Sequence, residues 1–162
     1  MFERFGRDSQ RVVLGALAAA KRLGAEQVEP EHLLLALVAG DSPAARAIAE
    51  AGMDAEAIGA AIEADLVAML ELVGVPASVV DATPPAPRVD RPDFGVHGRR
   101  ALEQAVREAA RRKDRRVGAE HLLLGVLHAS SPTLARVLAR LDVEPGRLAV
   151  LVDVELAAAA RR

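Results

Sequence analysis

The sequence predicts an all-α fold in which eight helices form two similar four-helix repeats. Apolar residues recur at the spacing of a helix, and no segment alternates with a period of two for long enough to indicate a sheet. Hydrophobic residues make up 51% of the chain, whereas aromatic residues make up only 2%. The core must therefore consist mainly of Ala, Leu and Val, which suits closely packed helices.

One segment of the chain occurs twice. The sequence EPEHLLLALV at residues 29–38 returns as GAEHLLLGVL at residues 118–127. This duplication places His32 and His121 at a spacing of 89 residues (121 − 32 = 89). Because an internal repeat of this kind is the signature of a duplicated unit, we expect two halves of the same fold.

The similarity extends well beyond the duplicated motif. At the same spacing, 14 of the 39 positions from Phe5 to Pro43 are identical to their counterparts, including the Phe-Gly pair at the start. After Pro43 the second copy contains one extra residue, so that Ile48 aligns with Leu138 at a spacing of 90 (138 − 48 = 90).

Each repeat is predicted to contain four helices, because apolar residues recur at helical spacing in four successive segments. Pro30 suits the first turn of the second helix. Asp41 or Ser42 can cap the third helix, and Pro43 can begin it, whereas the fourth helix begins near Asp54. The apolar faces of the first repeat comprise Val12, Val13, Ala16, Leu17, Ala20 and Leu23, then residues 31–38, then Ala45, Ile48 and Ala49, and finally Ile58, Ile62, Leu66 and Met69. Those of the second repeat comprise Leu102, Ala105, Val106 and Ala109, then residues 120–127, then Leu134, Val137, Leu138 and Leu141, and finally Leu148, Leu151, Val152 and Leu156.

The chain divides into a first repeat at residues 1–73, a linker at residues 74–93 and a second repeat at residues 94–162. The linker is predicted to be extended because it holds five of the nine prolines. A single four-helix unit this short would bury too little surface. We therefore expect the two halves to pack together as a pseudo-twofold pair. The prolines of the linker are Pro76, Pro84, Pro85, Pro87 and Pro92.

Composition and motifs exclude several classes of function. The net charge of −2 gives no global attraction for nucleic acid or anionic lipid, and the absence of Cys excludes disulfides and thiolate chemistry. No stretch reaches the roughly 18 apolar residues of a membrane span, and the charged N-terminus does not resemble a signal peptide. No G-x-S-x-G or H-E-x-x-H motif is present. We expect a soluble cytoplasmic protein that is not an enzyme, needs no cofactor or metal and has no membrane partner.

Four features together resemble a known family. The opening MFERF, the run Arg11-Val12-Val13, the segment Lys21-Arg22-Leu23-Gly24 and the doubled Glu-His-Leu-Leu-Leu are similar to the N-terminal domain of Clp unfoldases, especially the ClpC branch. The resemblance implies a helical domain that recruits substrates and adaptors ahead of two ATPase modules. This sequence contains no GxxxxGK[ST] phosphate loop. A stand-alone relative is the expectation, and an excised domain is the alternative.

Glu31 and Glu120 are the first candidate site residues. Acidic groups at the start of a helix gain from the helix dipole, so a structural capping role is one interpretation. The resemblance implies another, because the matching glutamates of ClpC proteins bind the guanidinium of phosphoarginine. The family usually has Thr before each Glu and after each Phe. Here those four positions hold Pro30, Ala119, Gly6 and Gly95, so the hydroxyl donors are absent.

His32 and His121 suggest a metal site only superficially. Neighbouring residues on a helix point about 100° apart, so the Glu and His of one motif do not converge on one ion. No third ligand is suitably spaced. We predict that each imidazole is structural and hydrogen-bonded beneath the helix packing.

The resemblance also implies a surface that binds cyclic peptide antibiotics such as cyclomarin. The matching residues are Phe2 and Phe94, with Arg99, Arg100 and Glu103 on the adjacent helix and Gln10 where the family commonly has Arg. An exposed pair of Phe side chains would anchor a peptide. The alternative is that both rings close the core.

The run from Arg107 to Arg116 is the remaining candidate. It is rich in Arg and would contact phosphates. Because no aromatic residue is interleaved with it, a solvated helix end is the favoured interpretation, and nucleic acid is not expected as a partner.

The function predicted from these features is non-catalytic binding of a substrate protein, an adaptor or a cyclic peptide. Two roles follow: a decoy that sequesters ligands of a full-length Clp unfoldase, antibiotics included, or an adaptor or regulator of that machine. A nucleic-acid-associated protein using residues 107–116 is the competing class, and a concealed enzyme is the weakest alternative.

Overall fold

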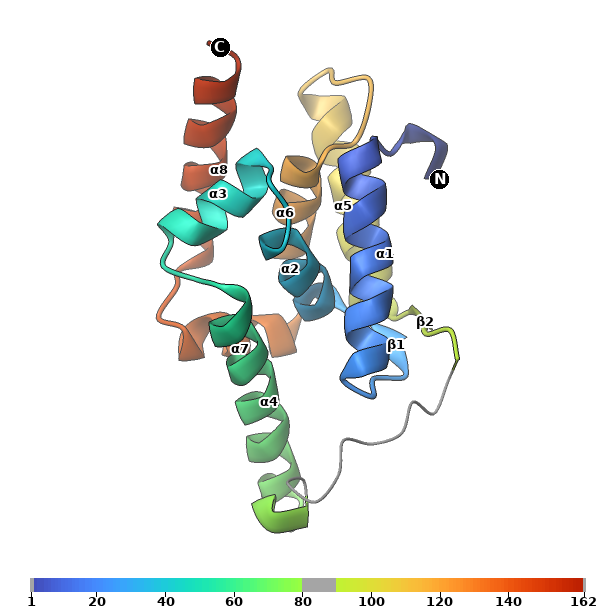
Figure 1. Ribbon diagram of the computed structural model, residues 1–162, viewed down its shortest axis with the longest axis vertical. Coiled ribbons are helices and arrows are strands. Elements are labelled where there is room, and N and C mark those ends of the chain that lie inside the picture. The colour runs from blue at the N-terminus through green and yellow to red at the C-terminus, as the bar shows by residue number, and fades with distance from the viewer. Residues whose placement is uncertain (1, 80–89, 162) are drawn as a thin grey trace.

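The computed structural model describes residues 2–79 and 90–161, and these residues fold into eight α-helices with two short strands (Figure 1). The all-α prediction and the expected number of helices are confirmed. The first repeat contains η1 (Phe2–Arg4), α1 (Arg7–Arg22), β1 (Gln27–Val28), α2 (Pro30–Val38), α3 (Pro43–Glu50) and α4 (Ala55–Leu72), and η2 (Ala77–Val79) follows it. The second contains β2 (Asp93–Phe94), α5 (Val96–Arg111), α6 (Ala119–Leu127), α7 (Pro132–Arg140) and α8 (Pro145–Ala159).

The predicted helix starts are capped as the sequence indicates. The hydroxyl of Ser42 accepts a hydrogen bond from the backbone N–H of Ala45 at 3.1 Å, at the start of α3. The carboxylate of Asp54 accepts from Ala57 N at 2.7 Å, at the start of α4. These bonds satisfy backbone donors that a helix start leaves without partners.

The two repeats begin by pairing with each other. β1 and β2 run parallel, with Val28 opposite Phe94, and an isolated parallel bridge joins Phe5 to Val117. The two contacts are equivalent, because the repeat spacing of 89 residues relates Phe5 to Phe94 and Val28 to Val117. This reciprocity confirms the predicted pseudo-twofold relation. Strands of two residues are too short for an alternating sequence pattern to reveal them.

The last two helices of each repeat pack on the opposite repeat. α4 contacts α7, and α3 contacts α8. Each contact carries an ion pair: Arg46 Nε lies 2.8 Å from Glu155 Oε2, and Arg136 Nε lies 2.9 Å from Asp65 Oδ1. These pairs are counterparts under the spacing of 90 residues. These ion pairs were not predicted from the sequence. The available signal was that Arg46 aligns with Arg136 and Asp65 with Glu155.

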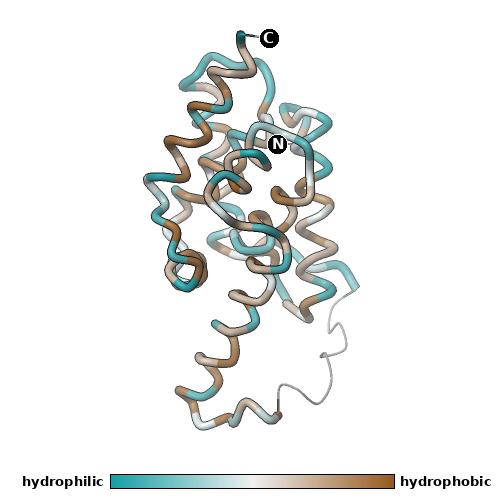
Figure 2. Tube along the Cα trace, turned by 60° about the vertical axis from the view of Figure 1, so that its left-hand side comes forward, coloured by the Kyte–Doolittle hydropathy of each residue, from teal (hydrophilic) through white to brown (hydrophobic). Residues whose placement is uncertain are grey.

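The core lies between the halves, where α2 packs against α6 (Figure 1). Leu33, Leu34 and Leu37 of α2 are fully enclosed, as are Leu122 and Leu123 of α6. By contrast, Figure 2 shows the end of α4 projecting from the body with several apolar residues along it. The duplicated Leu-Leu-Leu motif thus forms the centre of the domain.

Only the two ends of the expected linker, residues 74–79 and 90–93, are described. There Ala77–Val79 forms a 3-10 turn and Asp93 belongs to β2. Residues 80–89, which include three of the linker prolines, lie outside the described residues. Within the described parts of the chain, no single helix is long and apolar enough to cross a membrane, although the bent pair α6 and α7, at 99° to each other, meets the length and composition criteria together.

Replacing Gly125 by Ala is expected to destabilise the fold, because a β-carbon there would overlap the Ala101 carbonyl oxygen and lie 2.7 Å from Ala105 N. We expect a loss of about 1–3 kcal/mol in urea unfolding. Gly59→Ala is the control, since nothing lies within 4 Å of that position. It should stabilise α4 by up to about 1 kcal/mol. Equal effects of the two substitutions would contradict the close approach of α5 and α6.

Candidate functional site

The two histidines cap the helices that begin the duplicated motif. His32 Nδ1 accepts a hydrogen bond from Glu29 N, and His121 Nδ1 accepts one from Gly118 N, both at 2.9 Å. His121 Nε2 lies 3.0 Å from Asp114 Oδ2, which suits an imidazole that donates to the carboxylate. Burial lowers the pKa of His32 to about 4, so this ring is neutral at pH 7. The structural role predicted for both histidines is confirmed.

No metal-binding cluster forms around these residues. Within residues 2–79 and 90–161, no three His, Asp or Glu side chains lie close enough together to hold an ion. Nδ1 of each imidazole already accepts a hydrogen bond from a backbone N–H at the helix start, so it is not free to bind a metal.

Glu31 is enclosed between the repeats. Its side chain belongs to a residue only 7% exposed, and its Oε2 has no hydrogen-bond partner among the described residues. Burial raises the pKa of Glu31 to about 7, an effect partly opposed by its own backbone N–H and reinforced by the nearby Glu29 and Asp65. Nδ1 of the neighbouring His97 is likewise buried without a partner. Glu31 is therefore a buried acid and does not present its carboxylate to solvent.

Glu120, the counterpart of Glu31, borders an open cleft of about 640 Å³. The cleft lies where the start of α1 meets the start of α6, and Arg7, Arg115 and Arg116 contribute to its lining. The side chains of these three arginines are exposed and form no hydrogen bond or ion pair with the described residues. Asp8 crosses the cleft and accepts from Ala119 N at 3.1 Å. We call this region the Glu120 cleft.

Glu29 explains why the two copies of the motif differ. Its Oε2 accepts from Gly98 N at 2.7 Å, so its carboxylate caps α5 of the other repeat and covers Gly95. The counterpart of Glu29 is Gly118, which has no side chain to place at the start of α1. The first copy is thus closed by an internal carboxylate, whereas the second remains open.

The aromatic residues are not gathered at one place. The ring of Phe2 is tilted against that of Phe5, with centroids 5.4 Å apart, and Phe2 remains 46% exposed. Phe94 is half-buried at β2, near the opposite end of α1 from η1 (Figure 1). Gln10 donates from Nε2 to the Phe5 carbonyl at 3.0 Å. The structure therefore brings Gln10, but not Phe94, to the Phe2 side.

The side chains of Arg99, Arg100 and Glu103 are exposed on α5 and form no hydrogen bond or ion pair with other described residues. They do not line the Glu120 cleft. Their predicted role in binding a cyclic peptide stays a prediction.

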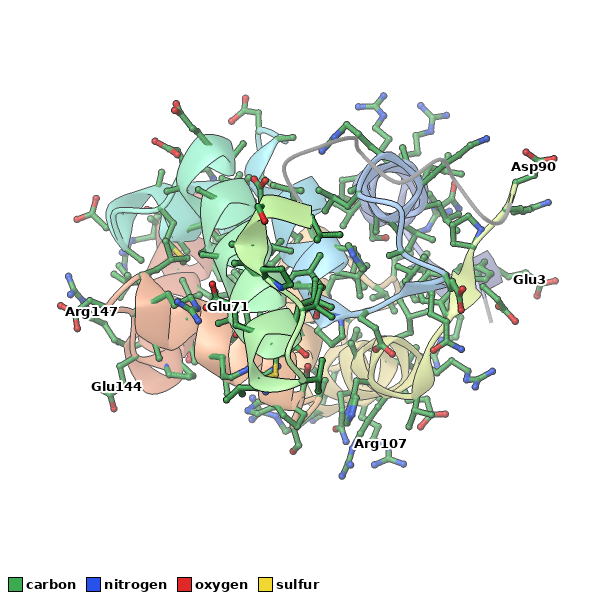
Figure 3. All side chains as sticks on the ribbon, turned by 90° about the horizontal axis from the view of Figure 1, so that it is seen from below. Glu3, Glu71, Asp90, Arg107, Glu144 and Arg147 are labelled. Carbon is green, nitrogen blue, oxygen red and sulfur yellow. The ribbon has the colours of Figure 1, made fainter. Side chains whose placement is uncertain are left out.

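Two cations of the basic run at residues 107–116, Arg111 and Arg112, are paired within the fold. Glu108 bonds to Arg111 and Arg112, and Arg112 also bonds to Asp153. The hydrogen bond from Arg111 is the main reason that the pKa of Glu108 falls to about 2. Arg107 points away from the body (Figure 3). The ion pairs at Arg111 and Arg112 interrupt the run, so its cations do not form one continuous phosphate-binding surface.

The fold and the cleft define a duplicated helical domain that offers ligand-sized recesses where its halves meet. The family model for the Clp repeat (R) N-terminal domain matches residues 4–91 and 93–161. The chain belongs to this family, whose domain is a substrate- and adaptor-binding module of Clp chaperones and not a catalytic domain.

Individual relatives agree with this assignment. The chloroplastic chaperone protein ClpC1 of Arabidopsis thaliana is 30% identical over 149 residues, which are 91% of this chain and 14% of that protein. The crystal structure of the N-terminal domain of ClpD from Arabidopsis thaliana superimposes with a TM-score of 0.71 at 22% identity, covering 97% of each chain. The Hsp104 N-terminal domain from Candida albicans gives a TM-score of 0.64 at 16% identity, covering 91% of this chain and 88% of that one.

The burial of Glu31 predicts a specific dependence of stability on pH. An unperturbed Glu titrates near 4.5 and folded Glu31 near 7, so stability should fall as the pH rises through this window. His32 acts in the opposite sense, because its folded pKa of about 4 lies below the ordinary 6.5, and it lowers stability on acidification.

Glu31→Gln should remove the first effect and leave the second. The variant should exceed the parent by roughly 3 kcal/mol at about pH 8 and match it near pH 4, as measured by urea unfolding. A gain for Glu31→Gln that is the same at both pH values would rule out titration of Glu31 as its origin.

Proposed function

We propose that the chain is a non-catalytic binding module, acting in the cytoplasm, that captures peptide segments of substrate proteins or adaptors in the Glu120 cleft. The observation that carries the proposal is that carboxylates and arginines line a single opening. The carboxylates are those of Asp8, Asp114 and Glu120, and the side chains of Arg7, Arg115 and Arg116 pair with no described residue. Such a lining suits a ligand group that is itself both positive and negative. Phosphoarginine, which the family resemblance suggests, combines a guanidinium with a phosphoryl group in this way.

The chemistry of the cleft compensates for its missing hydroxyls. The family's Thr positions here hold Gly6 and Ala119, which have no donor groups on their side chains. Arginine forms planar, charge-assisted pairs with phosphoryl oxygens, so Arg7 and Arg116 are suitable replacements. Glu120 would receive the guanidinium through paired hydrogen bonds. Because Glu31 is buried whereas Glu120 borders an open cleft, we assign the binding to the second repeat.

Isothermal titration with a phosphoarginine peptide tests this proposal. The parent should bind one equivalent, and Glu120→Gln should weaken binding by about tenfold, which corresponds to one lost charge-assisted pair. Glu31→Gln is the matched control and should bind as the parent does. The same peptide with unmodified Arg should bind much more weakly. Equal binding of the modified and unmodified peptides would contradict recognition of the phosphoryl group.

Cyclic peptides are a second ligand class, favoured by the exposed ring of Phe2 on Phe5. Cyclomarin should bind on the Phe2 side, so Phe2→Ala should weaken binding by about tenfold. Phe94→Ala should have a smaller effect, because Phe94 lies apart from Phe2. Loss of binding in Phe94→Ala alone would contradict this placement.

The biological role follows from which ligand binds. Binding of cyclomarin or phosphoarginine would support a decoy that competes with a full-length Clp unfoldase. Absence of both, together with co-purification of a Clp unfoldase, would support an adaptor or regulator. A retarded band with DNA or RNA at low salt would support the nucleic-acid alternative, which the ion pairs of Arg111 and Arg112 disfavour.

A further inference from the structure

A second recess lies along α1 and has no role in the proposed function. It is a groove of about 760 Å³ between α1 and α2, closed at one end by the turn that leads into α3. Its floor consists of small residues, among them Gly15, Ala18 and Ala36, and Arg11 and Arg22 border it. Asp8 lies between this groove and the Glu120 cleft, since it lines both.

The second repeat carries larger residues at the equivalent positions. At the spacing of 89 residues, Gln104, Arg107 and Glu108 correspond to Gly15, Ala18 and Ala19, and Glu108 is buried. The close approach of α5 to Gly125 of α6 further narrows the space, because even one β-carbon on Gly125 would overlap the Ala101 carbonyl oxygen. The groove is therefore a specific property of the first repeat and not a consequence of the shared fold.

The charges of the two repeats differ in the same way. In the second repeat, Glu108 is ion-paired with Arg111 at 2.6 Å. In the first repeat, the counterpart of Arg111 is Arg22, and Ala19 stands where its acidic partner would be. The side chain of Arg22 forms no hydrogen bond or ion pair with the described residues. The first repeat thus lacks both the side chains that fill the groove and the carboxylate that neutralises its cation.

We propose that this groove binds an amphipathic helix of a partner protein that supplies both missing elements. Small or apolar side chains on one face would cover Gly15 and Ala18, and a carboxylate in its first turn would meet Arg22. A helix fits because small residues allow close approach of two helices, and because a helix satisfies its own backbone hydrogen bonds where the groove floor offers none.

The charges also define the direction and length of the bound helix. Arg22 lies at the end of α1 and Asp8 in its first turn, a span of about 21 Å at 1.5 Å per residue. A helix of about four turns covers this distance. Its acidic first turn at Arg22 places it antiparallel to α1, so that its dipole also opposes that of α1. Basic residues in its last turn would then lie near Asp8.

A displayed library of alanine-based helices of about fifteen residues, randomised along one face, tests the proposal at low ionic strength. We expect selection on the full chain to enrich Asp or Glu at one end of that face and small apolar residues in its middle. Fluorescence anisotropy with the most enriched peptide then measures affinity for variants. Arg22→Ala should weaken binding by about tenfold. Ala18→Gln should weaken it by a similar factor, because the larger side chain would occupy part of the groove.

Arg111→Ala is the matched control, because it removes the corresponding arginine of the second repeat and should leave binding unchanged. The proposal is overturned if no acidic residue is enriched, or if the enriched peptide binds Arg22→Ala and Ala18→Gln as tightly as the parent. It is also overturned if the parent self-associates in sedimentation and Ala18→Gln abolishes this, since the occupant is then a second copy. Circular dichroism confirms that each variant is folded.

Discussion

Reciprocal packing of the two repeats is the constraint on which the structure depends. Each half begins by pairing with the other half, at Phe5 with Val117 and at Phe94 with Val28, and its last two helices pack on the opposite half. The side chain of Asp65 is only 3% exposed, and its charge is tolerable because Arg136 binds it through two nitrogens. Breaking a buried ion pair on one side leaves an uncompensated charge, so this contact helps fix how the halves are docked.

Local features of the fold were predictable from the sequence, and the exchange of helices was not. Ser42 and Asp54 act as caps because capping depends on residues only three positions apart. Helical periodicity shows which face of α4 is buried but does not say which helix covers it. Packing α4 on its own repeat or on the other one would satisfy the same pattern. Only the alignment of Arg46 with Arg136 indicates the partner helix, because each of these arginines pairs with an acid of the opposite repeat.

The candidate site shows the same division. The doubled Glu-His motif correctly predicted two equivalent capped helices, since each His reaches back to a backbone N–H three residues earlier. It did not predict that Glu31 is buried while Glu120 borders an open cleft. That difference depends on contacts across the interface between the repeats. Glu29 of the first repeat accepts a hydrogen bond from α5, whereas its counterpart Gly118 has no side chain with which to contact α1. Sequence identity within a motif therefore does not ensure an identical environment.

The exchanged helices also bear on how such a chain arises. An interface in which the same surface is used by both partners is the kind that a symmetric homodimer of single repeats would form. Joining two such units by a linker turns their association into an intramolecular event with a high effective concentration. Once joined, the two copies need no longer be identical, so one can keep an open cleft and the other an open groove. Joining the repeats in one chain therefore allows the two halves of a once symmetric unit to differ in their surfaces.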